Sequence, residues 1–305
     1  MIYTVTVNPA IDYVVRLDGA LTAGIINRST GEDIQFGGKG INVSNMLREL
    51  GQKTVALGFV AGETGAWLER GIAGMDLRTC FVRLERGMTR INVKVKGQEE
   101  TEINGMGPVI GSEDMEKLYG FLGEIAPGDV LVLSGSVPAC LGKDAYEKIL
   151  ARLEGREVLT VVDAAGELLT KTLRYRPFLV KPNDRELADV FHRNMETEGD
   201  ILFAARQLQN MGARNVLVSL AEDGALLVDE GGSVHRCKAP RGTVVNSVGA
   251  GDSMVAGFLA GWLETERYED ALKMGVAAGS ATAFSLGLAD RQSVEKLRKE
   301  LERDM

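Results

Sequence analysis

Histidine and cysteine are scarce in this chain. Its 305 residues include two histidines, His192 and His235, and three cysteines, Cys80, Cys140 and Cys237. The cysteines are widely separated and form no C-x-x-C pair, so neither a disulfide framework nor a zinc site is indicated. A catalytic system of the Ser-His-Asp or Cys-His kind would have to use one of the two histidines. A carboxylate is therefore the simpler choice of general base.

Positive charge is also in short supply. The chain carries 35 Lys and Arg against 43 Asp and Glu, a net charge of -8, which argues against nucleic acid or an anionic membrane as a partner. No apolar run approaches the ~20 residues of a membrane span, and the first residues resemble a strand rather than a signal peptide. We therefore expect a cytoplasmic protein. Its 45% hydrophobic content is ample for a core, and we expect residues 1–305 to form a single domain.

The two best-known phosphate-binding patterns are missing, since neither G-x-x-x-x-G-K-[ST] nor G-x-G-x-x-G occurs. Two other glycine-rich segments are present instead. GGKG at 37–40 opens an amphipathic segment, and Gly249, Ala250 and Gly251 lead into Asp252 and a second apolar segment. Small residues at a helix start let backbone N–H groups surround an anion. Two such loops and a carboxylate could serve phosphoryl transfer, although an Asp in a first helical turn is also simply helix-stabilising.

β-rich and helical segments alternate along most of the chain, as in DVLVLSG followed by KDAYEKILARL. This alternation predicts an α/β fold with a mostly parallel sheet and helices on both faces. Two regions interrupt it, about 12–36 and 88–104, and both read as hairpin-like strands without an intervening helix.

Seven segments in order resemble the PfkB-type, ribokinase-like sugar kinases, and the resemblance covers the whole chain. They are VTVNPAIDYV at 5–14, GGKGINVS at 37–44, TRINVKV at 89–95, LSGSVP at 133–138, VKPNDREL at 180–187, VSLAEDGALLV at 218–228 and VGAGDSMVAGF at 248–258. The resemblance implies a three-layer ribokinase-like fold in which the two interrupting regions form a small β-sheet lid. It further implies ATP and Mg²⁺ as cofactors and a homodimer joined through the lid.

Within this family the chain is most similar to enzymes that phosphorylate fructose 1-phosphate to fructose 1,6-bisphosphate. Kinases for tagatose 6-phosphate are near relatives, and a 6-phosphofructokinase of the same family is a further alternative. The physics of the sequence does not choose among these acceptors, because they differ in stereochemistry or in which end carries the phosphate. Asn246 stands where ribokinase-type members carry an Asp of a monovalent-cation site, so the resemblance does not carry an alkali-ion requirement over to this chain.

The resemblance also implies roles for individual residues. Asp252 matches the catalytic base, with the backbone of Gly249, Ala250 and Gly251 as the anion hole. The residues that match substrate contacts are Asp12, Gly37, Gly38, Lys39, Asn42, Arg90, Asn104 and Ser136. Of these, Lys39 and Arg90 are expected to bind the phosphate already on the sugar, since Arg offers a planar fork and Lys a point charge.

The nucleotide contacts implied by the resemblance are Lys181, Asn183, Ser219, Leu220, Ala221, Glu222, Asp223, Gly224, Gly251 and Asp252. Glu186, with Asn183, matches the family's magnesium motif and would hold Mg²⁺ through water. From the residues alone, Asn183 followed three positions later by Glu186 is equally typical of a helix-capping box.

Two other classes of protein remain to be compared with a kinase. A regulator that binds a nucleotide or phosphosugar without catalysis would have no need to keep Asp252, Glu186 and both glycine loops. A nicotinamide-dependent oxidoreductase also uses glycine-rich turns on parallel sheets, but it would carry G-x-G-x-x-G in the first strand-to-helix turn. Binding of ATP rather than NAD would separate these classes.

Overall fold

The computed structural model describes residues 1–303, which form two sheets. In this part of the chain the larger sheet has nine strands in the order β13-β12-β11-β10-β9-β8-β1-β4-β5, and only β12 and β13 pair antiparallel to their neighbours. The strands are β1 (Ile2–Thr6), β4 (Thr54–Ala61), β5 (Thr79–Leu84), β8 (Val130–Ser134), β9 (Leu159–Asp163), β10 (Leu179–Val180), β11 (Asn215–Ser219), β12 (Ala225–Val228) and β13 (Val234–Cys237). The expected mostly parallel sheet is confirmed.

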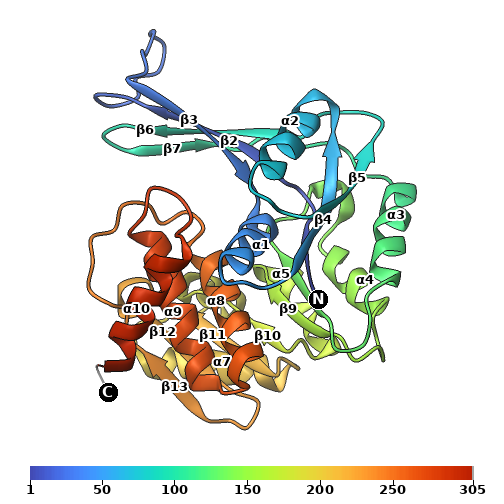
Figure 1. Cartoon of the computed structure of the whole chain (residues 1–305), viewed down its shortest axis with the longest axis vertical. Helices are drawn as coiled ribbons and strands as arrows, with labels where there is room; N and C mark the ends of the chain where they lie inside the picture. Colours follow the sequence, from blue (N-terminus) through green and yellow to red (C-terminus); the bar gives the residue numbers. More distant parts are fainter. Residues whose placement is uncertain (304–305) are drawn as a thin grey trace.

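Helices cover both faces of this sheet. They are α1 (Lys39–Glu49), α2 (Gly62–Ala73), α3 (Ser112–Gly123), α4 (Ala145–Ala151), α5 (Gly166–Thr170), α6 (Asp184–Phe191), α7 (Glu198–Asn210), α8 (Ala250–Thr265), α9 (Tyr268–Ala283) and α10 (Arg291–Arg303), with short 3-10 turns η1 (Ala139–Leu141), η2 (Leu173–Tyr175) and η3 (Ala221–Asp223). Figure 1 shows α8, α9 and α10 grouped on one side and α3 and α4 on the other.

Strand residues alternate between two hydrophobic cores. Leu131, Leu133 and Val162 pack with α3, α4 and α7, whereas Val130, Val132 and Val161 pack with α1, α8 and α9. A strand that is buried on both faces reads as a continuous apolar run, which is the pattern of VLVL and TVV in the sequence. None of the helices in residues 1–303 combines the length and the apolar character needed to cross a membrane.

The two interrupting regions come together as the second sheet, the lid, in the order β3-β2-β6-β7. Its strands are β2 (Ala10–Arg16), β3 (Gly31–Gly37), β6 (Arg90–Lys96) and β7 (Glu100–Ile103). In Figure 1 the lid projects from one end of the molecule. The expected hairpin at 12–36 needs a correction: β2 begins at Ala10, and residues 17–30 form no strand. The two regions are joined by parallel pairing of β2 with β6, a long-range contact that no local pattern contains.

Candidate active site

A cavity of about 1010 Å³ lies where the parallel strands end, between the larger sheet and the lid. Thr6, Asp163 and Ser219 are the last residues of β1, β9 and β11, and all three line it. The carboxyl ends of parallel strands are where α/β proteins bind ligands. The cavity is at the upper end of the size of small-molecule sites, so it has room for more than one small ligand.

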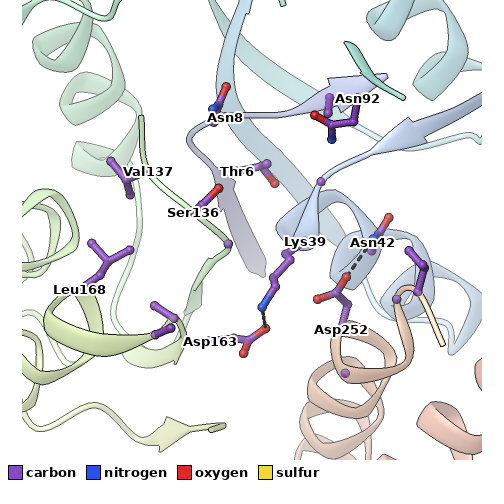
Figure 2. Close-up of a pocket in the computed structure, with 18 of the residues that line it drawn as sticks. Thr6, Asn8, Lys39, Asn42, Asn92, Ser136, Val137, Asp163, Leu168 and Asp252 are labelled. Atoms are coloured by element: carbon purple, nitrogen blue, oxygen red, sulfur yellow. Dashed lines mark hydrogen bonds and ion pairs between the residues drawn. The ribbon is translucent and has the colours of Figure 1, made fainter. Parts of the chain in front are cut away.

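Asp252 is buried in the wall of this cavity. It stands in the first turn of α8, whose start at Gly249 has a left-handed φ of 80°, and it is 5% exposed. Its Oδ2 accepts a hydrogen bond from Asn42 Nδ2 at 2.8 Å (Figure 2). Burial, with a contribution from the nearby Asp163 carboxylate, raises the pKa of Asp252 to about 6, and Lys39 limits the rise. A carboxylate with a pKa near neutrality is suited to general-base catalysis.

Backbone donors adjoin this carboxylate. Within residues 1–303, the N–H groups of Gly249 and Gly251 have no hydrogen-bond partner, and both residues line the cavity. The N–H of Ala250 instead donates to the Ser247 carbonyl at 3.3 Å, and Ala250 is not part of the lining. Unpaired N–H groups at a helix start attract anions. The geometry therefore favours Gly249 and Gly251 over Ala250 as anion-hole donors.

A second buried carboxylate in the cavity wall, Asp163, pairs with two lysines. This fully buried carboxylate lies 3.5 Å from Lys39 Nζ and 3.2 Å from Lys181 Nζ, and it accepts a hydrogen bond from Ser134 Oγ at 3.2 Å. Burial alone would raise the pKa of Asp163, but Lys181 and Lys39 together lower it. In turn, the Asp163 carboxylate raises the pKa of Lys39 well above its usual value. Both lysines line the cavity near Asp252.

The GGKG loop brings Lys39 to this position. Gly38 has a φ of 138°, and a Cβ there would lie 2.5 Å from Thr6 Cγ2, so a larger residue would not fit. The Ile41 N–H donates to Thr6 Oγ1 at 3.0 Å, which ties the start of α1 to the end of β1. As a result, α1 begins at the cavity with Lys39 and Asn42 in its first turn.

The lid forms the remaining wall. Arg90 Nε donates to the Asn8 carbonyl at 3.1 Å, and the arginine has no carboxylate partner within ion-pair distance in residues 1–303. Burial lowers the pKa of Arg90, while Asp12 acts against that shift. Asp12 Oδ1 accepts a hydrogen bond from Asn92 Nδ2 at 2.8 Å. The lid thus presents one cation without an ion pair and one hydrogen-bonded carboxylate to a ligand.

Asn183 and Glu186 form the capping box of α6. Asn183 Oδ1 accepts from the Glu186 N–H at 2.7 Å, and Glu186 Oε2 accepts from the Asn183 N–H at 3.0 Å. Both residues also line the cavity. Residues 1–303 contain no group of three or more His, Cys, Asp or Glu side chains placed to share a metal ion.

Most of the residues expected from the sequence meet in this cavity. Those that line it are Asp12, Gly38, Lys39, Asn42, Arg90, Ser136, Lys181, Asn183, Glu186, Ser219, Gly249, Gly251 and Asp252. Those outside the lining are Gly37, Asn104, Leu220, Ala221, Glu222, Asp223, Gly224 and Ala250. Asn104 is exposed, whereas Asn92 lines the cavity and accepts a hydrogen bond from the Gly105 N–H. The segment 220–224 continues from Ser219 beyond the cavity edge.

Among the cavity residues that the sequence analysis did not single out are Asp163, Asn92 and Lys94. The sequence nevertheless contains features that point to these three residues. Asp163 is a carboxylate at the end of the apolar run VLTVV, where a buried strand of a parallel sheet opens onto a ligand site. Asn92 and Lys94 alternate with Arg90 along β6 and therefore share its face. Neither histidine lines the cavity, in agreement with the choice of a carboxylate base.

Phosphotransferases are the class of enzyme that this fold and site define, because a poised carboxylate, unpaired backbone donors and two lysines converge where a phosphoryl group could pass. Residues 4–295 match the description "pfkB family carbohydrate kinase". The chain belongs to the pfkB family of carbohydrate kinases.

Similar proteins of known name agree with this membership. A Bacillus subtilis protein named 1-phosphofructokinase is 43% identical over 99% of this chain and 98% of its own length. A D-tagatose-1-phosphate kinase from Bacillus licheniformis is 36% identical over 99% of each chain. Among solved structures, phosphofructokinase-2 from Escherichia coli in complex with substrates and products superimposes with a TM-score of 0.92 at 29% identity, covering 99% of each chain.

Proposed function

We propose that this chain transfers the γ-phosphoryl group of ATP to the free terminal hydroxyl of fructose 1-phosphate, giving fructose 1,6-bisphosphate and ADP. The observation that carries the proposal is Asp252, a buried carboxylate with a pKa of about 6 at the start of α8. The 43% identical relative named 1-phosphofructokinase supports the choice of acceptor. Asp252 accepts the proton of the attacking hydroxyl, while Asn42 holds the carboxylate in place.

The charged groups of the cavity have separate roles toward the nucleotide and toward the sugar phosphate. The Gly249 and Gly251 N–H groups stabilise charge on the transferred phosphoryl group, and Lys39 and Lys181, anchored by Asp163, neutralise the nucleotide phosphates. Arg90 binds the phosphate already on the sugar, because it is the lid cation with no carboxylate partner of its own. The earlier expectation that Lys39 joins Arg90 in this task stays a prediction, and its ion pair with Asp163 favours the nucleotide side.

The residues present fit a hydrated Mg²⁺ that arrives with ATP. The capping box uses only the Oε2 oxygen of Glu186, whereas Asp163 Oδ1 is buried 3.2 Å from Lys181 Nζ. The second carboxylate oxygen of Glu186 can therefore accept a hydrogen bond from metal-bound water, which Mg²⁺ gives up reluctantly. Bound Mg²⁺ supplies charge neutralisation at the β- and γ-phosphates.

We also propose a homodimer in which the lids of two copies pair. Ile34, Tyr13, Val93 and Ile103 are cross-strand neighbours on the lid face opposite to Asp12 and Asn92. Ile34 and Ile103 are 42% and 61% exposed. An apolar row on a small sheet is best covered by another protein surface. The cytoplasmic location expected from the sequence stays a prediction.

The test of the proposed function is a coupled assay of ADP release. Fructose 1-phosphate should give a kcat/KM well above that of fructose 6-phosphate, tagatose 6-phosphate and unphosphorylated fructose. Tagatose 1-phosphate belongs in the same panel, because the Bacillus licheniformis relative is named for it. Preference for a 6-phosphate, or ATP binding without turnover of any ketose phosphate, would contradict the proposal.

A further inference from the structure

The lid wall of the cavity contains a buried lysine to which the mechanism above gives no role. Lys94 lies in the middle of β6, is only 7% exposed, and lines the cavity with Arg90 and Asn92. The three residues alternate along one strand, so their side chains stand on the same face of the lid. Lysine is almost never so buried unless it is paired.

The Lys94 ammonium lies between two carboxylates. Its Nζ is 3.3 Å from Glu102 Oε1, directly opposite on β7, and 3.7 Å from Asp12 Oδ2 on β2. Asn92 holds the other oxygen of Asp12 by a hydrogen bond. An ammonium group has three N–H donors, so one remains for a ligand after these two contacts. Lys94 thus joins three strands of the lid and partly neutralises two acids that face the cavity.

The charge balance of the cavity depends on this lysine. Its lining contains the cations Lys39, Arg90, Lys94, Lys143 and Lys181 and the carboxylates Asp12, Glu102, Asp163, Glu186 and Asp252. Lys39 and Lys181 are committed to Asp163. At the lid, therefore, two cations, Arg90 and Lys94, balance two carboxylates, Asp12 and Glu102. Without Lys94, the lid wall of the cavity would carry a net negative charge. That field would repel a dianionic phosphate.

We propose that Lys94 is a specificity residue that offsets Asp12 and Glu102 and so allows the lid to accept a phosphorylated sugar. The inference rests on the proposed function and concerns how the same cavity selects its acceptor. An unphosphorylated ketose brings no charge and gains little from the lysine, whereas a phosphate held by Arg90 gains from each positive charge nearby. Lys94 sets the preference for phosphorylated over neutral acceptors rather than the rate of phosphoryl transfer.

The test compares Lys94→Met with wild type on fructose 1-phosphate and on unphosphorylated fructose. Methionine keeps an unbranched chain of similar length and removes only the charge. The ratio of kcat/KM for the two sugars should fall about tenfold or more, the effect of removing one unit charge near a dianion at a partly shielded site. The fall should lie mainly in KM for fructose 1-phosphate and shrink at high salt. Lys94→Arg should retain most of the preference.

Two further variants separate charge from structure. Lys96→Met removes the same charge from the same strand and face, beside Glu100 at 3.6 Å, but Lys96 does not line the cavity, so its acceptor ratio should stay at the wild-type value. The double variant Lys94→Met with Glu102→Gln restores the local charge balance and should recover most of the lost preference. Thermal unfolding of each variant shows which ones are folded for the comparison.

The outcomes distinguish the inference from the function on which it rests. If the wild type prefers a phosphorylated ketose, then an unchanged acceptor ratio in Lys94→Met, or no recovery in the double variant, would overturn the role of Lys94 alone. If Lys94→Met fails to fold, the double variant and Glu102→Gln still decide, because Glu102→Gln by itself should strengthen the preference. A wild type that uses only unphosphorylated sugars would overturn both proposals.

Discussion

At the scale of single residues, two buried carboxylates in one cavity have pKa values that are shifted in opposite directions. Asp252 faces Asn42 and the negative Asp163, and its pKa rises to about 6. Asp163 faces two ammonium groups and a hydroxyl, and its pKa falls. Different surroundings therefore give one aspartate the properties of a base and the other those of a permanent anion.

This difference predicts the pH dependence of the reaction. Because the folded-state pKa of Asp252 is raised, kcat/KM should fall as the pH drops through about 6 and the base becomes protonated. Asp252→Asn should bind ATP but lose at least ~100-fold in kcat, the usual size of a general-base effect. A pH–rate profile that stays flat from pH 5 to 8, or an active Asn variant, would contradict the assignment.

The same pKa shift makes a separate prediction for stability. A raised folded-state pKa means that Asp252 favours the folded state at low pH, and this contribution is lost as the pH rises through about 6. Asp252→Asn carries no charge to bury, so above pH 6 it should melt at the same temperature as wild type or higher. Melting curves at pH 5 and pH 8 measure this difference. A variant that is much less stable at pH 8 would show that Asp252 acts chiefly in structure.

The proposed role of Arg90 leads to a prediction about the use of the acceptor sugar. Replacing Arg90 by Ala should lower kcat/KM for fructose 1-phosphate about ten- to hundredfold, since hydrogen bonds to a charged group contribute ~1.5–3 kcal/mol. ATP affinity should be unchanged, because Arg90 lies on the lid wall. Arg86→Ala, at an exposed position in the loop before β6, is the matched control. An equal loss with unphosphorylated fructose would make Arg90 a structural residue of the lid.

At the scale of elements, helix starts assemble the site. The starts of three helices line the cavity, through Lys39 of α1, Gly251 of α8 and the α6 cap Asn183, so three helix dipoles direct their positive ends toward it. The phosphates of ATP and of a phosphosugar are the kind of ligand that such an arrangement favours. The capping box of α6 places Glu186 there whether or not it serves a metal.

A comparison of two capping boxes can separate the helix-capping role of Glu186 from a role in metal binding. Asp200 completes the same motif on α7, with Thr197, and does not line the cavity. Glu186→Gln and Asp200→Asn should each change stability little, because the side-chain amide oxygen of Gln or Asn can still accept the N–H of the N-cap residue. Only Glu186→Gln should raise the Mg²⁺ concentration needed for half-maximal activity. An unchanged Mg²⁺ titration would leave Glu186 with its capping role alone.

At the scale of the whole molecule, the lid closes one end of the cavity and presents its other face outward. Tyr13 and Val93 share a row with the exposed Ile34 and Ile103, so this outer face is apolar across all four strands. In the proposed dimer, one small sheet would combine an acceptor-binding face with a surface for a second copy. The proposals for the oligomeric state and for the acceptor site therefore involve the same strands.

The dimer proposal predicts a specific response to charge on that outer face. Ile34→Glu should convert the dimer to a monomer and raise KM for the sugar more than KM for ATP, because only the lid loses support. Phe203→Glu, at an apolar position 48% exposed on α7, is the control and should leave the mass unchanged. Light scattering measures both. A wild-type protein that is monomeric at every working concentration would rule the dimer out.

The sequence by itself determined the layered α/β fold, because buried parallel strands read as apolar runs and the intervening segments have helical periodicity. It also determined the helix starts at 37–40 and 249–252 and indicated Asp252 as a candidate base, since glycines and a carboxylate there are local features. The two lid regions were visible for the same reason, as strands that no helix separates.

Only the tertiary structure decided which distant residues meet. Asp163 contacts Lys39 across 124 positions of sequence, and Asn42 reaches Asp252 across 210. Asn92 and Lys94 line the cavity and Asn104 does not, and the parallel pairing of β2 with β6 fixes which face of the lid meets the cavity. The tertiary structure also decided the pKa of Asp252. Burial and the charge of Asp163 set this pKa, and both are properties of the assembled cavity and not of the segment 249–252.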